Sequence, residues 1–275
     1  MQRVKVVEIE PAVLAMDSLF YAVNDSVLLR HNVHAVVDDA RSALQLDRTR
    51  YDLIVSEPSN PWVAGIATLY TPEFFRIARS RLADDGVFCQ WIQLYQLPLP
   101  IVAGIVSSLR EVFPHVNVWF GGTSDLIVLA SQRPISYDRQ WIGQLLNPGS
   151  GLYGLGREWL SIDSPDQYFG RMLLGDSGVS RLITRAEFNH TDVRPRLEFV
   201  AARRFLDPGA GAYAGFDSLM QIGRRDGNTT PFALLRILPQ RRGDAGVLPY
   251  LEGARRAQPE VSEWIVRMAG IRLAM

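Results

Sequence analysis

Short apolar segments alternate with helical segments along the first 131 residues, and this order constrains the fold more than any other feature. Candidate strands are residues 4–9, 34–37, 51–56, 87–93, 116–120 and 126–131, and candidate helices are 11–21, 41–46, 72–82 and 101–113. Strands that alternate with helices are typical of a mainly parallel sheet with helices on both faces. The last two strands are close enough to pair as an antiparallel hairpin. The sequence therefore predicts a Rossmann-like α/β fold.

Composition and breaks in the pattern predict three parts. Residues 1–135 form the α/β domain, residues 136–206 complete it with mostly helical structure, and residues 207–275 form a helical tail after a Gly- and Pro-rich linker at 208–215. The chain has 275 residues, with 29 Lys and Arg against 29 Asp and Glu. A neutral chain of this kind gives no indication of nucleic acid binding.

One uncharged segment, residues 87–109, is long enough to span a bilayer. It also contains Gln90, Gln93 and Gln96 and two prolines, which fit a buried strand followed by a loop and a helix. We therefore expect no membrane span here and a cytoplasmic location. The single cysteine, Cys89, agrees with a reducing compartment.

Acidic residues follow two of the predicted strands, where open α/β sheets bind their ligands. Glu8 ends the first strand and could accept the ribose hydroxyls of a nucleoside, although a solvated strand-end acid explains it as well. Asp39 follows the second strand and could bind an adenine amino group, and Asp38 is the fallback for this role. Asp39 is also a good helix N-cap, and both uses are compatible.

A rigid polar loop, residues 56–62 (Ser-Glu-Pro-Ser-Asn-Pro-Trp), follows the apolar strand 51–56. A loop of this kind directly after a strand expected to be buried on both faces is more typical of an active site than of structural filler. Glu57 could act as a general base or anchor a cationic amine, while Asn60 and Trp62 could hold a second group. The structural alternative is a turn with a half-buried tryptophan.

The remaining polar candidates lie along the fourth strand and its exit. Gln90 and Tyr95 could line a substrate pocket, although an aromatic residue here is as often part of the core. The four histidines are scattered without ligand spacing, so we expect no metal. The positions of Ser, Cys and His suggest no nucleophilic triad.

Several of these segments resemble spermidine synthases in order and spacing. They are Val-Val-Glu-Ile-Glu-Pro (6–11), Val-Asp-Asp-Ala-Arg (37–41), residues 51–62 and Gln-Trp-Ile-Gln-Leu-Tyr (90–95). Residues 189–195 (Asn-His-Thr-Asp-Val-Arg-Pro) are similar to a late segment of a divergent bacterial group in which this domain can follow a transporter-like membrane region. The resemblance covers about residues 4–206.

The resemblance implies a class I S-adenosylmethionine methyltransferase-type fold and transfer of an aminopropyl group from decarboxylated S-adenosylmethionine to a small-molecule amine. It implies Glu57 as the catalytic base, with the nucleoside bound by Glu8, Asp38 or Asp39, and Ser56. The amine would contact Asn60, Trp62, Gln90 and Tyr95. The family has an aspartate where Asn60 stands here, so the usual diamine substrate is open to question.

A glycine-rich turn normally precedes the ribose-binding acid by about 20 residues, yet only seven residues precede Glu8. The resemblance therefore implies that a central strand and its glycine loop, between strands 4–9 and 51–56, are missing. Either these two strands pair directly, or the true start of the protein lies upstream. In the second case the longer gene product could include a membrane region that tethers the domain to the inner membrane. We expect the chain as given to be weakly active or inactive.

Two other functions stay open. One is an S-adenosylmethionine-dependent methyltransferase, since Asn60-Pro61-Trp62 faintly resembles the Asn-Pro-Pro-aromatic loop of amine-methylating enzymes. The other is a non-catalytic, degenerate domain in regulation or assembly. A homodimer is also compatible with the sequence.

Overall fold

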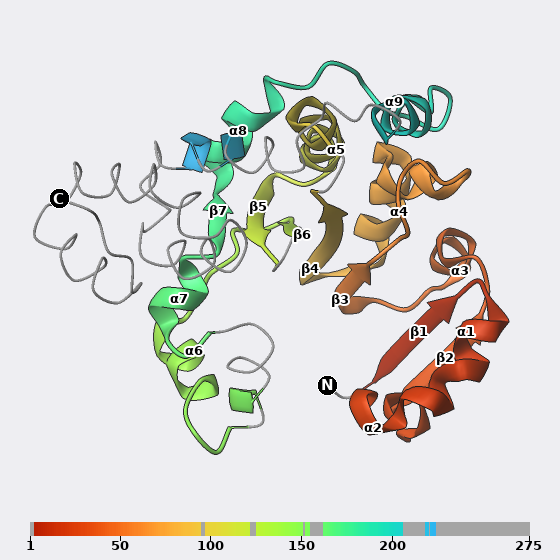
Figure 1. Cartoon of the computed structure of the whole chain (residues 1–275), viewed down its shortest axis with the longest axis vertical. Helices are drawn as coiled ribbons and strands as arrows, with labels where there is room; N and C mark the ends of the chain where they lie inside the picture. The colour runs from red at the N-terminus through yellow and green to blue at the C-terminus, as the bar shows by residue number, and fades with distance from the viewer. Residues whose placement is uncertain are drawn as a thin grey trace, which may run out of the picture.

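The computed structural model describes residues 3–94, 97–121, 125–150, 152–154, 162–205, 218–219 and 221–223. Its strands form two separate sheets (Figure 1). The smaller sheet pairs β1 (Val4–Glu8) with β2 (Val33–Val37). The larger has the order β3-β4-β6-β5-β7, with bounds β3 (Tyr51–Ser56), β4 (Leu82–Gln93), β5 (His115–Phe120), β6 (Asp125–Ser131) and β7 (Met172–Leu174).

The direction of strand pairing changes along the chain. β1 with β2 and β3 with β4 pair in parallel, whereas β4 with β6, β6 with β5 and β5 with β7 pair antiparallel. The predicted α/β class and the antiparallel hairpin of β5 and β6 are confirmed. β7 was not predicted: it lies in a segment expected to be mostly helical.

Helices cover the larger sheet and support the smaller one (Figure 1). α5 packs against α4 and α8, and all three helices contact strands of the larger sheet, while α3 lies between β1 and α4. The helices are α1 (Pro11–Ala15), η1 (Met16–Phe20), α2 (Tyr21–Asn24), η2 (Val27–Leu29), α3 (Ala40–Leu46), η3 (Ile66–Tyr70), α4 (Pro72–Arg81), α5 (Leu99–Val112), α6 (Arg139–Leu145), α7 (Pro165–Phe169), α8 (Asp176–Ile183) and α9 (Arg196–Phe205).

The predicted helix 11–21 is in fact a series of short helices, α1, η1 and α2. None of their residues is buried, so the segment has no core contact to hold one continuous helix. Asp25 and Ser26, both with positive φ, then turn the chain toward η2.

The core lies between the larger sheet and its helices. Phe88 of β4 stacks on Phe113 just after α5, with ring centroids 5.9 Å apart, and both rings are fully buried. The uncharged segment 87–109 therefore spans the second half of β4 and most of α5, as predicted. Among the described residues, no helix has the length and apolar character needed to cross a membrane.

β1 is an edge strand of the smaller sheet and β3 is an edge strand of the larger sheet. Among the described strands, these two do not pair with each other. The prediction that β3 is buried on both faces was wrong. Its residues Leu53 and Val55 are 42% and 60% exposed because one face of this edge strand is uncovered. Direct pairing of strands 4–9 and 51–56, one of the two alternatives that the sequence left open, is not observed among the described strands.

Residues 84–86 (Asp-Asp-Gly) lie inside β4, where the register with β3 shifts between Tyr51 and Leu53. A Cβ atom on Gly86 would lie 2.9 Å from the Tyr51 carbonyl oxygen and 3.0 Å from that of Ala83. Both neighbours are backbone atoms and cannot rotate away. This irregularity in β4 therefore requires glycine.

Replacing Gly86 by alanine should lower the free energy of unfolding by about 1–3 kcal/mol, because the added methyl group forces the β3–β4 ladder apart. Urea denaturation would measure the loss. Gly143→Ala in α6 is the matched control, since its Cβ meets only Pro165 at an ordinary 3.5 Å. That helical substitution should be neutral or stabilising by up to about 1 kcal/mol. Equal effects of both variants would contradict the steric argument.

The linker predicted at 208–215 lies outside the described residues, as does the tail at 207–275 apart from 218–219 and 221–223. Leu219 is fully buried in the core, and the Ile222 carbonyl accepts a 3.4 Å hydrogen bond from Arg181 of α8.

Candidate active site

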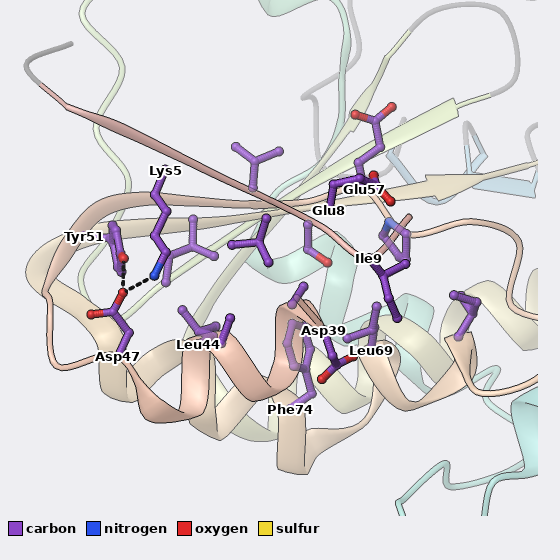
Figure 2. Close-up of a pocket in the computed structure, with 18 of the residues that line it drawn as sticks. Lys5, Glu8, Ile9, Asp39, Leu44, Asp47, Tyr51, Glu57, Leu69 and Phe74 are labelled. Carbon is purple, nitrogen blue, oxygen red and sulfur yellow. Dashed lines mark hydrogen bonds and ion pairs between the residues drawn. The ribbon is translucent and has the colours of Figure 1, made fainter. Parts of the chain in front are cut away.

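A cavity of about 330 Å³ lies between the two sheets. β1 and β3 supply its walls, and apolar side chains of α3, η3 and α4 supply its base, among them Leu44, Leu69 and Phe74. Figure 2 shows Glu8 and Glu57 toward one end of the cavity and Lys5, Asp47 and Tyr51 toward the other. The cavity therefore has a carboxylate-lined end and an ion-paired end.

Glu8 lies at the carboxyl end of β1 and lines the cavity. Its Oε1 accepts a 2.9 Å hydrogen bond from the Glu10 backbone N–H, which fixes the carboxylate close to the strand end. Glu10 itself caps α1 by accepting from the Ala12 N–H at 3.0 Å. The two neighbouring acids thus differ: Glu8 faces the cavity, and Glu10 has a structural use.

Asp39 is the N-cap of α3, as predicted, and it also lines the cavity. Its adenine-binding role stays a prediction. The cap is a 2.7 Å hydrogen bond from the Ser42 N–H to Asp39 Oδ1. Asp38 does not line the cavity. Its backbone N–H donates to the Glu8 carbonyl at 3.0 Å, which extends the β1–β2 ladder, and its Oδ1 accepts from the Asp39 N–H at 2.8 Å.

Ser56 is the last residue of β3 and Glu57 follows it directly, and both line the cavity. The Glu57 side chain is exposed. Burial, reinforced by the Glu57 charge, raises the pKa of Cys89 to about 11. The Cys89 thiol is therefore protonated at neutral pH and is not a nucleophile.

Of the residues expected to bind a second substrate, the three that the structure describes are not part of the cavity lining. The Asn60 carbonyl accepts from the Val63 N–H at 3.0 Å in a turn, and Trp62 packs against the core. Gln90 is fully buried, with its amide donating to the Ser56 carbonyl at 3.3 Å and the Trp91 carbonyl at 3.1 Å. Tyr95 lies outside the described residues. Their substrate-binding role stays a prediction.

The opposite end of the cavity contains a polar group that the sequence did not indicate. Asp47, after α3, accepts hydrogen bonds from Lys5 Nζ at 2.7 Å, the Tyr51 hydroxyl at 2.6 Å and the Thr49 N–H at 2.8 Å. These bonds, that of Lys5 above all, hold the pKa of Asp47 well below its usual range. Asp47 thereby joins β1 to the start of β3, although Lys5 and Asp47 are 42 residues apart.

Known proteins similar to the chain include one sequence relative and several solved structures. No family model matches the chain. Over 112 residues, the chain is 37% identical to a polyamine aminopropyltransferase from Synechococcus sp.. This match supports assigning the chain to the spermidine synthase family. The match covers 38% of the chain and 36% of the relative, so the chain spans only about a third of the length of this relative.

Solved structures with some likeness include two of the same family. A probable spermidine synthase from Corynebacterium glutamicum is 19% identical, with a TM-score of 0.40 over 59% of this chain and 62% of that one. A spermidine synthase in complex with the transition-state analogue AdoDATO is 17% identical, with a TM-score of 0.44 over 51% of each chain. Human methyltransferase-like protein 13, in complex with SAH, has a TM-score of 0.39 over 50% of this chain and 64% of that one, at 19% identity.

Proposed function

We propose that the chain transfers an aminopropyl group from decarboxylated S-adenosylmethionine to a small-molecule amine. The observation that carries this proposal is the common cavity of Glu8, Asp39 and Glu57, which come from two different sheets and the start of α3. Three carboxylates around one cavity suit a cationic sulfonium and an amine. The family assignment supports the same chemistry.

In this reaction the amine nitrogen attacks the methylene carbon next to the sulfonium. A C–N bond forms, the C–S bond breaks, and its electrons neutralise the sulfur, so methylthioadenosine leaves. An alkylamine has a pKa of about 10 in water and is mostly protonated at neutral pH. A carboxylate beside the nitrogen can take that proton and orient the lone pair. We assign this role to Glu57. In the same proposal Glu8 binds the ribose and Asp39 binds the adenine.

We expect turnover by this chain to be slow. Glu8 is on one sheet and Glu57 on the other, and the two sheets share no strand pairing among the described residues. Small errors in the relative position of two reacting groups cost large factors in rate, because catalysis depends on prior orientation. Single-turnover measurements at high protein concentration are therefore the appropriate assay.

The proposal predicts that the chain binds decarboxylated S-adenosylmethionine more tightly than S-adenosylmethionine, since the extra carboxylate of the latter would meet the acidic end of the cavity. Calorimetry would compare the two. Methylthioadenosine release with putrescine and a panel of mono- and diamines would then identify the acceptor. Preference for S-adenosylmethionine with release of S-adenosylhomocysteine would indicate a methyltransferase instead. Binding of neither compound would favour a non-catalytic domain.

A further inference from the structure

A late segment of the chain contacts the elements around the candidate site. This segment, which we call the latch, comprises residues 189–195 between α8 and α9. Thr191 and Arg194 exchange backbone hydrogen bonds of 3.3 and 3.0 Å, which close a tight turn with Asp192 inside it. The function proposed above assigns no role to the latch.

His190 anchors the latch to η3. Its ring is 1% exposed, with Nε2 2.7 Å from the Ala67 carbonyl oxygen, and Nδ1 accepts a 3.3 Å hydrogen bond from the Leu197 N–H. A carbonyl only accepts and an N–H only donates, so the ring is neutral and carries its proton on Nε2. Burial lowers the pKa of His190, in agreement with this form.

Asp192 then binds Arg41 of α3 through both carboxylate oxygens. Arg41 Nη1 donates to Asp192 Oδ1 at 2.9 Å, and Arg41 Nη2 forms an ion pair with Oδ2. Thr71, the N-cap of α4, contacts Asp192 Oδ1 at 2.8 Å through its hydroxyl, and the Asp192 N–H donates to Glu73 at 3.3 Å. The side chains of Arg41 and Asp192 are only 21% and 32% exposed, so solvent weakens this two-point ion pair less than a fully exposed one.

Arg41 lies two residues after Asp39, in the first turn of α3. Its Nη1 also donates to the Thr68 carbonyl of η3 at 3.1 Å, so one guanidinium joins α3, η3 and the latch. η3 follows the loop that begins with Glu57, whereas α3 begins with the Asp39 cap. The guanidinium therefore links two helices at the base of the cavity, one that follows Asp39 and one that follows the Glu57 loop.

We propose that Asp192 and Arg41 are positioning residues that hold α3 where Asp39 can bind the nucleoside. The proposal rests on the function given above for its ligand. Neither side chain lines the cavity, so both act through Asp39 and not by contact with the substrate.

The test compares Asp192→Asn, Arg41→Gln and the double variant with wild type. Each single change should weaken methylthioadenosine binding and raise KM for the nucleoside substrate about tenfold, roughly the effect of one charge-assisted hydrogen bond. kcat should stay within about twofold, because Glu57 is not displaced. The loss in the double variant should be smaller than the sum of the two single losses, since both single changes remove the shared ion pair. Additive losses would overturn the proposal.

Hydrogen exchange separates positioning from general stability. Amides of residues 40–46 should exchange about tenfold faster in Asp192→Asn, while those of β4 and α5 are unchanged. Equal acceleration everywhere, or none in residues 40–46, would overturn the proposal. Asp166→Asn, which removes an exposed pair with Arg139, is the control and should change nothing. If wild-type protein binds no methylthioadenosine, the proposed function fails, whereas the exchange data still decide whether the pair holds α3.

Discussion

Replacing Glu57 by glutamine should reduce kcat for aminopropyl transfer by about 100- to 10,000-fold, the range that a general base contributes. The amide keeps the shape of the side chain but cannot accept the proton of the attacking ammonium. Single-turnover release of methylthioadenosine at neutral pH would measure the loss. The deficit should shrink as the pH approaches about 10, where the amine loses its proton without help.

Asp52→Asn provides the matched control for this variant. Asp52 is an exposed carboxylate on the same strand, β3, but it does not line the cavity. Its replacement should leave kcat within about twofold of wild type. A Glu57→Gln protein that retains wild-type kcat at neutral pH would show that this carboxylate is not the base.

Replacing Asp47 by alanine should lower the free energy of unfolding by about 2–3 kcal/mol at pH 7, because Lys5 and Tyr51 then lose their shared acceptor. The Asp47 side chain is only 14% exposed, so water replaces these bonds incompletely. Asp85→Ala removes an exposed ion pair with Arg133 and should cost less than about 1 kcal/mol. Urea denaturation of both variants would make the comparison.

The pH dependence of this difference follows from the two pKa shifts. The pKa of Asp47 is lowered from 3.8, so its contribution is present above that pH and is lost as the pH falls through the native value. The pKa of Lys5 is raised from 10.5, so its contribution is present below that pH and is lost at higher pH. Wild type and Asp47→Ala should therefore differ most between these limits. A difference independent of pH would argue against the ion pair.

Much of the fold could be predicted because its signals are local. The apolar run Tyr51–Ser56 has the bounds of β3, and helix 72–82 corresponds to α4 with its Thr71 cap and first-turn proline. Strand β7 has only three residues, Met172–Leu174, which is too short to produce a periodic pattern. Its partner β5 lies more than 50 residues earlier, so its strand conformation depends on a distant contact.

The candidate site likewise has some residues that the sequence could predict and some that it could not. Glu8 and Asp39 were predicted from the rule that ligands bind beyond the carboxyl ends of parallel strands. Glu57 was predicted from the polar loop after a strand, and Ser56 from the resemblance to spermidine synthases. All four line one cavity. Their chemical roles remain predictions. The Lys5–Asp47 and Arg41–Asp192 pairs could not be predicted, because their members are 42 and 151 residues apart and no local pattern joins them.

Among the described strands, β1 and β3 have no pairing partner on the borders next to the cavity, and this affects more than the cavity itself. β3 presents backbone groups beside the exposed apolar side chains of Leu53 and Val55, and such an edge readily recruits an extended segment from another molecule. We therefore expect the chain to associate wrongly with other copies while it folds and at high concentration. Any polypeptide that fills the space between the sheets would shield it from such aggregation and would at the same time bring Glu8 and Glu57 into one continuous framework.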